Sequence, residues 1–296
     1  MSNIVIDPMN QRMVREVMIV TDKQILTPHY IRIYLTGKLD TIANIATMTI
    51  GVNNKVFIPV DKTQPLDLDD KANFTIRTYT HRGIDVEKQQ IWIDFIAHGD
   101  ESPASGWAIH AQVGDQLGVL MKPKNKPLYP LVDNFLLVGD ATAIPVLGAI
   151  LESLPSGSTV QCIIEVYGKE DEQDLPTSAN VKMTWLHNAN PVQGSQLADT
   201  IKSLTLPSEK LSRFAYVAGE FSSVKAIRHY LKKEKNWSTN ELYAFSYWKS
   251  GIAEDKSANA RREEKRRMQN RYGYFIMLKI SILSLEEHAV AMLLKT

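Results

Sequence analysis

The feature that most constrains the fold is a change of hydrophobic pattern at residues 122–130, where three prolines fall within nine positions. Before this segment, apolar and polar residues alternate, as in Tyr30–Thr36, where Ile31, Ile33 and Leu35 share one face. After it, short apolar runs alternate with stretches of helical spacing. Because proline cannot continue the interior of a sheet, the segment predicts a domain boundary.

The first part of the chain predicts a small antiparallel β-barrel. Its strand-type runs, separated by segments rich in Gly, Pro, Asp and Asn, are Val14–Val20, Tyr30–Thr36, Met48–Val52, Lys55–Pro59, Phe74–Thr80, Ile91–His98 and Leu117–Met121. We therefore expect residues 1–127 to form a β-barrel domain.

The second part predicts an α/β domain with a parallel sheet, because strands and helices alternate along it. The expected strands are Phe135–Val138, Ser158–Tyr167, Val181–Leu186, Phe214–Ala218 and Glu241–Trp248. Helices are expected after Gly139, near Gln196–Leu204 and over Phe221–Lys235. We assign residues 128–271 to this domain, including a basic helix over 252–271, and treat 272–296 as a tail of unassigned role.

The composition argues against several classes of protein, namely nucleic-acid-binding, disulfide-stabilised and membrane-spanning proteins. A formal net charge of +1 gives no global attraction to nucleic acid. The single cysteine, Cys162, excludes an internal disulfide framework and indicates a reducing cytoplasm. The most apolar tract, Tyr272–Leu285, contains Lys279 and is shorter than the roughly 20 residues of a membrane span. We therefore expect a cytoplasmic protein without a membrane span.

Motifs of several enzyme classes are absent from the sequence. It contains no G-x-S-x-G elbow, no H-E-x-x-H pair, no Walker A loop and no metal-spaced His/Cys cluster. Hydrolase and metalloenzyme interpretations thereby lose most of their support, and we expect no metal bound by the protein itself.

The segment FTIRTYTHR carries the first residues suited to a cofactor. Strand alternation places Arg77 and Tyr79 on one face and Phe74, Ile76 and Thr78 on the opposite face, which we expect to face the core. Arginine suits a phosphate, and tyrosine can lie against a flat heteroaromatic ring.

Two further segments predict phosphate or nucleotide contacts. Small residues in ESPASGW, followed by a helical turn from Pro103, would point free N–H groups at an anion. Gly139 and Gly219 each end an apolar strand ahead of a helix, at the edge where open α/β sheets bind ligands. Without a G-x-G-x-x-G fingerprint, this second signal is weak when taken alone.

Taken in order, these segments resemble the siderophore-interacting protein family, flavin-dependent ferric-siderophore reductases related to ferredoxin-reductase-like flavoproteins. The resemblance runs from about Arg12 to Arg271. Its carriers are RTYTHR from Arg77, DFIAHG from Asp94, SPASGWA from Ser102, GD from Gly114, GDATAIP from Gly139, WLH from Trp185, AGE from Ala218 and YWKSG from Tyr247.

The resemblance implies a FAD-binding antiparallel barrel followed by an NAD(P)H-binding α/β domain. The implied residues for the flavin and its phosphates are Arg77, Thr78, Tyr79, Thr80, Arg82, Asp94, His98, Ala104, Ser105 and Trp107. Those implied for the nicotinamide side are Gly139, Asp140, Thr142, Pro145, Gly219 and Glu220, with Tyr247 and Trp248 near the isoalloxazine. No catalytic side chain is expected, because the flavin carries the chemistry.

The implied reaction is reduction of a ferric siderophore, with electrons from NADPH, NADH or a reduced ferredoxin. Oxygen-rich siderophores are hard ligands that favour Fe(III), so reduction releases iron. Ferric complexes of catecholate or mixed-ligand siderophores are often anionic, and the resemblance points to Lys55, Lys124 and Lys249 as their binding residues.

Two alternatives remain open at this point. A general flavin or electron-transfer reductase would share the fold but pass electrons to a protein. A carrier would bind the ferric siderophore without reducing it, and would hold no flavin.

Overall fold

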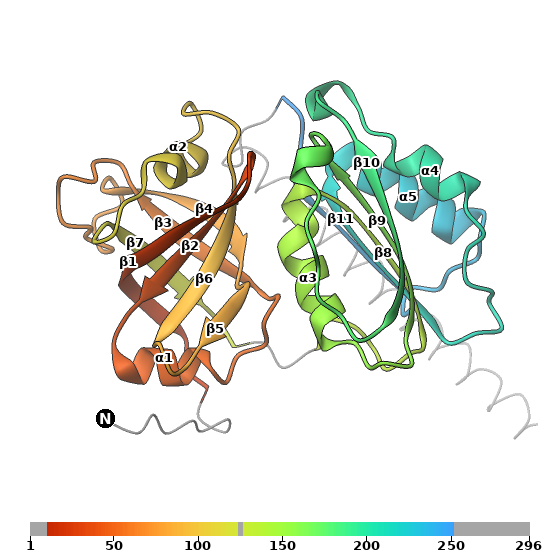
Figure 1. The fold of residues 1–296 in the computed structure, drawn as a ribbon, viewed down its shortest axis with the longest axis horizontal. Helices are drawn as coiled ribbons and strands as arrows, with labels where there is room; N and C mark the ends of the chain where they lie inside the picture. Colours follow the sequence, from red (N-terminus) through yellow and green to blue (C-terminus); the bar gives the residue numbers. More distant parts are fainter. Residues whose placement is uncertain (1–10, 124–126, 252–296) are drawn as a thin grey trace, which may run out of the picture. The chain divides into compact units, whose positions relative to one another are not determined.

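The structure, a computed structural model, describes residues 11–123 and 127–251 (Figure 1). It contains two β-sheets, both within one compact unit that ends at Ser250. Three predictions lie outside the described residues: the basic helix over 252–271, the tail over 272–296, and Lys124 as a substrate-binding residue.

The N-terminal sheet has seven strands in the order β4-β3-β7-β1-β2-β6-β5, and all its neighbouring strands run antiparallel. These strands are β1 (Val14–Thr27), β2 (Tyr30–Thr36), β3 (Asn53–Pro59), β4 (Phe74–Thr80), β5 (Gly83–Asp85), β6 (Gln90–Ile96) and β7 (Gln116–Met121). Although β4 and β6 are not neighbours in the sheet, the rings of Tyr79 and Phe95 lie 4.4 Å apart. The sheet is therefore curled into a half-barrel, which confirms the predicted antiparallel barrel-type domain.

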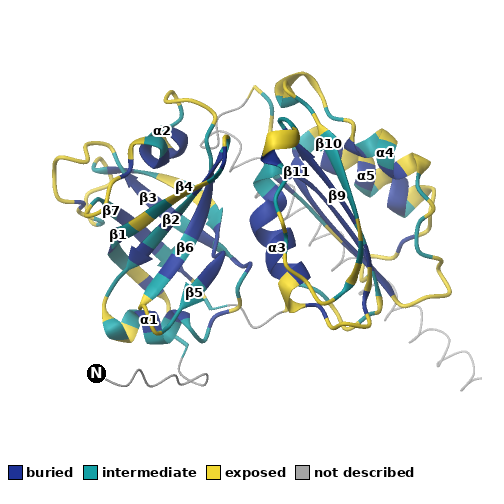
Figure 2. Ribbon diagram, viewed as in Figure 1, coloured by how far each residue is buried: buried dark blue, intermediate teal, exposed yellow. Residues whose placement is uncertain are grey.

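Alternating apolar residues fill the inside of this half-barrel. Ile33 and Leu35 on β2 and Ile93 on β6 are fully buried, and they belong to one core with Ala104 and Trp107 (Figure 2). Those last two residues lie on helix α2 (Pro103–His110), which confirms the helical turn expected from Pro103. The core thus anchors the helix whose N-terminus was predicted to face an anion.

One predicted strand is wrong. Residues 48–52 form a turn rather than a strand, although Met48 and Val52 are buried as their apolar pattern suggests. Gly51 adopts a φ of 90°, which lies outside the strand region, and a Cβ there would be 2.6 Å from Leu128 Cδ1. Two short elements were not predicted: helix α1 (Leu39–Ile45) and strand β5.

The predicted facing of β4 is also wrong. Ile76 has 42% of its surface exposed and Thr78 is exposed, whereas Tyr79 is half-buried against the core. Phe74, on the same outward face, is buried against Phe57 and Leu66, but Ile76 and Thr78 stay exposed, so apolar character did not decide which face of β4 turns inward.

The C-terminal sheet has five parallel strands in the order β10-β9-β8-β11-β12. Its strands are β8 (Asn134–Asp140), β9 (Thr159–Val166), β10 (Asn180–His187), β11 (Arg213–Glu220) and β12 (Leu242–Trp248). Its helices are α3 (Ile144–Ser153), α4 (Leu197–Ser203) and α5 (Phe221–Lys233), with short 3-10 turns at Ala141–Ala143, Lys169–Asp171 and Pro191–Gln193. These elements confirm the predicted parallel α/β architecture.

Helices cover both faces of this sheet. The core on one face is shared with α3, whose residues 144–151 are all buried (Figure 2). The core on the other face includes residues of α4 and α5. The strand order reverses direction between β8 and β11, and such a switch point is where open α/β sheets bind ligands beyond their carboxyl ends.

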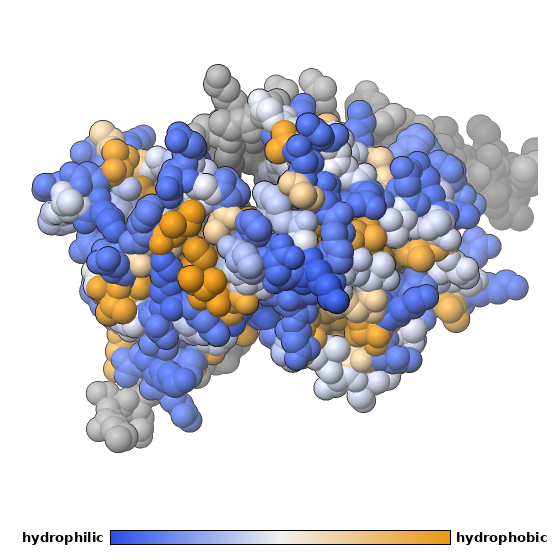
Figure 3. Space-filling model, turned by 45° about the horizontal axis from the view of Figure 1, so that its top comes forward, coloured by the Kyte–Doolittle hydropathy of each residue, from blue (hydrophilic) through white to orange (hydrophobic). Residues whose placement is uncertain are grey.

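The surface has no single dominant apolar area on the face drawn in Figure 3, where hydrophobic atoms occur in separate groups among hydrophilic ones. The most exposed large apolar side chains, such as Ile25, Val60 and Leu131, come from different parts of the sequence. No helix in the described ranges is long and apolar enough to cross a membrane.

Candidate functional site

The predicted flavin motif lies on β4, across the ladder from β3. Arg77 is half-buried and donates to the carbonyl of Ile76 at 2.9 Å. Thr80 is buried, and the ring of Tyr79 packs against Phe95 at the inside of the half-barrel. The structure therefore presents an arginine and a tyrosine side by side on the inner face of an edge strand, in the pairing that the sequence predicted.

The segment between β6 and α2 is held against the start of α2. The backbone N–H of His98 donates to Ser105 Oγ at 2.9 Å, and Ser105 is fully buried. Ser102 occupies the N-cap of α2 but makes no capping hydrogen bond with its side chain. The first N–H groups of a helix point along its axis and favour an anion, so this end of α2 is a suitable phosphate site.

Two buried polar side chains near Tyr79 have no hydrogen-bond partner within the described residues. Asn54 lies directly opposite Tyr79 on β3, is 2% exposed, and leaves both its amide nitrogen and its oxygen unpaired. Trp107, whose ring is 5.6 Å from that of Phe95, leaves Nε1 unpaired. An unpaired buried polar group costs about 1–3 kcal/mol, so these atoms suit a bound polar group. The sequence analysis missed Asn54, although an asparagine between apolar strand residues was a usable signal.

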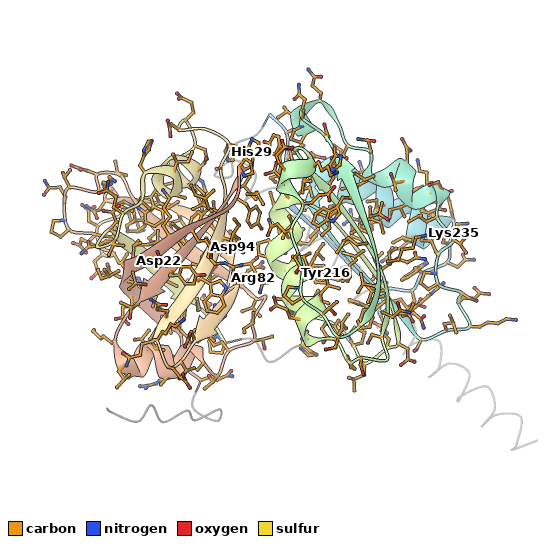
Figure 4. The ribbon with its side chains drawn as sticks, viewed as in Figure 1. Asp22, His29, Arg82, Asp94, Tyr216 and Lys235 are labelled. Carbon is orange, nitrogen blue, oxygen red and sulfur yellow. The ribbon has the colours of Figure 1, made fainter. Side chains whose placement is uncertain are left out.

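Arg82 and Asp94, both predicted to contact the flavin, belong to a network of ion pairs (Figure 4). Asp94 on β6 accepts from Arg32 Nε at Oδ1 (2.7 Å) and from Arg32 Nη2 at Oδ2 (2.9 Å), and Arg82 Nε lies 3.9 Å from Oδ2. Arg82 also donates to both carboxylate oxygens of Glu152 on α3. The structure thus gives these two residues protein partners that the sequence pattern did not reveal.

Asp140 is the central polar group at the carboxyl edge of the C-terminal sheet. Its Oδ1 accepts from the N–H and the hydroxyl of Thr142 at 2.9 and 2.5 Å. Its Oδ2 accepts from the N–H of Glu220 and from Trp248 Nε1, both at 2.8 Å. Burial raises the pKa of Asp140, and the hydrogen bonds from Thr142, Trp248 and Glu220 offset part of this effect. The structure therefore brings together Asp140, Thr142 and Glu220, which the resemblance assigned to the nicotinamide side, with Trp248, which it assigned near the isoalloxazine.

The other predicted residues of this edge surround Asp140. Pro145 is buried in the first turn of α3, and Glu220 caps α5 by accepting from the N–H groups of Ser222 and Ser223. Burial raises the pKa of Tyr247, and the neighbouring phenol of Tyr243 adds to the rise. Gly139 and Gly219 end the neighbouring strands β8 and β11.

The two described lysines predicted for the substrate lie on different sheets. Lys55 on β3 is half-buried and donates to the hydroxyl of Thr78 across the ladder. Lys249 follows β12, is exposed, and places Nζ 4.8 Å from the ring centre of Phe221.

A second polar cluster escaped the sequence analysis. Asp171, after β9, accepts from the Thr27 hydroxyl at 2.8 Å and from the backbone N–H of His29 at 3.1 Å. Its other oxygen lies 2.8 Å from His29 Nδ1, and the His29 ring stacks on Tyr167 at 4.5 Å. These residues are far apart in sequence, and nothing in their spacing signalled the contact. No group of three or more His, Cys, Asp or Glu suited to a metal ion occurs among the described residues.

Both sheets lie in segments of the chain that match models of known protein families. Residues 19–126 match the family model described as the siderophore-interacting FAD-binding domain, and residues 132–251 match the one described as siderophore-interacting protein. A curated relative from Vibrio cholerae serotype O1, named ferric vibriobactin reductase ViuB, is 32% identical over 246 residues, covering 79% of this chain and 89% of the relative.

Solved structures agree with these matches. The siderophore-interacting protein SipS from Aeromonas hydrophila superposes with a TM-score of 0.71 at 27% identity, over 85% of this chain and 98% of that chain. The ferredoxin-NADP+ reductase from Plasmodium falciparum shares the fold, with a TM-score of 0.57 at 14% identity over 78% of this chain and 96% of that chain.

Proposed function

The chain belongs to the siderophore-interacting protein family, and from this membership and the geometry of both sheets we propose that it reduces ferric siderophores and so releases Fe(II). One observation carries the proposal. The FAD-binding family model matches the N-terminal sheet, the siderophore-interacting family model matches the C-terminal sheet, and each sheet contains candidate site residues. The relative named a ferric vibriobactin reductase, matched over 79% of this chain, supports the reaction.

The residues of the N-terminal sheet fit FAD. Unpaired atoms of Asn54 and Trp107 near Tyr79 offer both donors and an acceptor to a polar ring system. Arg77 on β4 and the first N–H groups of α2 supply positive charge for a pyrophosphate. We assign Arg77, Tyr79 and the loop that Ser105 holds to the flavin; Thr78, Thr80, His98, Ala104 and Trp107 complete this set.

Arg82 and Asp94 act differently in this proposal. Their charges are taken up by each other and by Arg32 and Glu152, so they fix the shape of the flavin site. When bound, FAD accepts a hydride from the reduced nicotinamide and passes electrons singly to ferric iron.

The carboxyl edge of the C-terminal sheet binds the nicotinamide nucleotide. Thr142 and Pro145 lie in the first turns after β8, and Gly139 and Gly219 lie at the carboxyl ends of the neighbouring strands β8 and β11, where open α/β sheets bind ligands. One hydride carries two electrons, so one NADPH or NADH reduces two ferric complexes and releases a proton.

Lys55 and Lys249 attract the anionic ferric complex. Lysine is a flexible point charge, which suits a substrate whose negative charge is spread over many ligand oxygens. Once iron is reduced, hard oxygen ligands hold it far more weakly. We place this reaction in the cytoplasm, because the lone thiol of Cys162 is buried and unpaired, as expected for a reducing compartment.

The test uses the purified full-length protein. We expect a flavin absorbance spectrum that bleaches anaerobically with NADPH, NADH or reduced ferredoxin and recovers when a ferric siderophore is added, while a chelator traps Fe(II). Tyr79→Ala should lower FAD content, and Tyr34→Ala, on β2 of the same sheet, is the matched control.

The other outcomes reject the proposal in distinct ways. A colourless protein that cannot be reconstituted with FAD but binds ferric siderophore is a carrier. A flavoprotein that reduces a protein acceptor and leaves ferric siderophores unchanged is a general electron-transfer reductase.

A further inference from the structure

The carboxylate of Asp140 joins three chain segments at the edge of the C-terminal sheet. Asp140 is the last residue of β8. Its carboxylate accepts hydrogen bonds from Thr142 in the next turn, from Glu220 at the end of β11 and from Trp248 at the end of β12. Asp140 is buried, with 7% of its surface exposed. These three contacts come from residues up to 108 positions apart, so the arrangement is a product of the tertiary fold.

All the partners of Asp140 are donors. An ionised carboxylate offers about four acceptor positions, and the two groups of Thr142, the N–H of Glu220 and the indole N–H of Trp248 occupy that number. Asp140 therefore has few acceptor positions left to contact a bound nucleotide directly. It can affect a ligand through the residues that donate to it, Thr142, Glu220 and Trp248.

The neighbouring strand is shaped to accept this carboxylate. Gly219 has a φ of 146°, and a Cβ at that position would lie 2.6 Å from Asp140 Oδ2. A side chain at 219 would push away the oxygen that holds Trp248. The glycine and the aspartate thus form a matched pair that brings β11 and β12 to one acceptor.

Other contacts hold the chain beyond Trp248 but do not touch its indole. The N–H of Ser250 donates to Glu220 Oε1 at 3.4 Å, and the Ser250 hydroxyl donates to the carbonyl of Val192 at 3.0 Å. The Trp248 indole has a single N–H, and Asp140 Oδ2 accepts from it at 2.8 Å. This hydrogen bond ties the indole to Asp140.

We propose that Asp140 is a positioning residue that fixes the indole of Trp248 at the carboxyl edge of the C-terminal sheet, and thereby sets the affinity for the nicotinamide nucleotide. The second half of this statement rests on the proposed function. A fixed indole is a preformed flat wall for a nicotinamide ring, and preorganisation of this kind lowers the entropy lost on binding. A freely rotating indole would have to be ordered by each nucleotide that binds.

Asp140→Asn is the most direct variant, because it keeps the shape of the side chain and replaces one acceptor oxygen with an NH2 donor. Its Oδ1 can still accept from Thr142, but its NH2 would face the two donors of Glu220 and Trp248. Asp133→Asn, an exposed aspartate just before the other end of β8, is the matched control. Asp140→Glu keeps the charge but displaces it by one methylene, so it serves if Asp140→Asn does not fold.

The first readout is the indole itself. Acrylamide quenching of tryptophan fluorescence is measured with and without Trp248→Phe, so that the signal of Trp248 is isolated from the other four tryptophans. We expect Trp248 to become more accessible to acrylamide in Asp140→Asn or Asp140→Glu, and to stay unchanged in Asp133→Asn. Thr142→Val removes a bond only from Oδ1, so it should leave this signal unchanged as well.

The second readout is a double-mutant cycle on the binding of NADP+ and NAD+, followed by flavin difference spectra of the holoprotein. We expect Asp140→Asn and Trp248→Phe each to weaken binding about tenfold, the size of a lost hydrogen bond to a charged group. The double variant should bind no more weakly than Trp248→Phe alone. FAD content should stay at the wild-type value in Asp140→Asn, because Asp140 lies outside the N-terminal sheet, and nucleotide affinity is compared for all variants at full FAD loading.

Two results overturn the proposal: unchanged quenching of Trp248 in Asp140→Asn, or effects on nucleotide affinity that multiply to about a hundredfold in the double variant. Failure of the proposed function looks different. If the wild-type protein binds neither NADP+ nor NAD+, the nucleotide donor is rejected and with it the second half of this inference, while quenching still decides whether Asp140 fixes Trp248.

Discussion

The guanidinium of Arg82 and the carboxylate of Glu152 form a two-point ion pair, with Nη1 3.0 Å from Oε2 and Nη2 2.5 Å from Oε1. Arg82 follows β4 of the N-terminal sheet, and Glu152 lies in α3 beside the C-terminal sheet. Gly148 makes room for this contact, since a Cβ there would lie 3.1 Å from Arg82 Nη2. The pair therefore links the strand that carries the flavin motif to the helix that follows the Asp140 turn.

Replacing either Arg82 or Glu152 should lower the free energy of unfolding, but by different amounts. Glu152→Ala should reduce the free energy of unfolding by about 1–2 kcal/mol, because Glu152 is partly solvated. Arg82→Ala should cost about 3 kcal/mol or more, because it also takes a cation from buried Asp94. Urea unfolding followed by circular dichroism measures both. Glu209→Ala, on an exposed loop, is the control, and equal losses for all three variants would contradict this account.

His81 should make stability depend on pH in the acid range. Burial lowers the pKa of His81 to about 4, and neither ring nitrogen has a partner among the described residues. Because the folded state disfavours the proton, its contribution is complete above the unfolded pKa of about 6.5 and is lost as pH falls towards 4. Relative to His81→Leu, the wild-type protein should lose about 3 kcal/mol over that interval.

The measurement is a pair of urea unfolding series between pH 7 and pH 4. The free energy of unfolding of the wild type minus that of His81→Leu should fall steadily as pH falls, whereas exposed His229→Gln should run parallel to wild type. A constant difference for His81→Leu would show that the imidazole is not buried in its neutral form.

Asp171 should act in the same sense as His81, because the folded state lowers both pKa values and so favours the deprotonated form of each side chain. Burial raises its pKa, but hydrogen bonds from Thr27 and His29 outweigh burial and leave the pKa below its usual value. The stability that it supplies is present above pH 4 or so and is lost as pH falls through the lower folded pKa. Asp171→Asn should therefore cost about 2 kcal/mol at pH 7.

That cost should diminish below about pH 4, where the unfolded carboxyl binds a proton in the wild-type protein too. Thermal unfolding over pH 3–7 tests this, with Asp199→Asn as the exposed control. A cost for Asp171→Asn that does not change with pH would mean that its shape, and not its charge, holds Thr27 and His29.

Lys55 is the lysine whose proposed role is most directly testable. Lys55→Ala should weaken binding of an anionic ferric triscatecholate about fivefold, while FAD content stays the same, since one partly exposed charge contributes at most about 1 kcal/mol. The effect should shrink at high salt. Binding is followed by quenching of protein fluorescence, with the exposed Lys88→Ala as control. Unchanged affinity at low salt would remove Lys55 from the substrate site.

The sequence predicted both architectures because their patterns are local. Alternation such as that of Ile31, Ile33 and Leu35 requires a strand with one buried face, and apolar strands followed by helices require a parallel sheet. Local patterns failed at residues 48–52 and at Ile76. There the outcome depended on a positive φ at Gly51 and on the tertiary packing of β4, which buries Phe74 but leaves Ile76 exposed on the same face.

In the candidate site too, the sequence predicted local features, whereas contacts between distant residues came only from the tertiary structure. The sequence by itself determined which residue types stand at strand ends and before helices, and so identified Arg77, Tyr79, Asp140 and Trp248 as site residues to test. It could not reveal that Arg82 pairs with Glu152, that Asp171 holds His29, or that Asp140 holds Trp248. Those partners are 70 to 142 residues apart, and only the packing of the chain decides which donor meets a buried carboxylate.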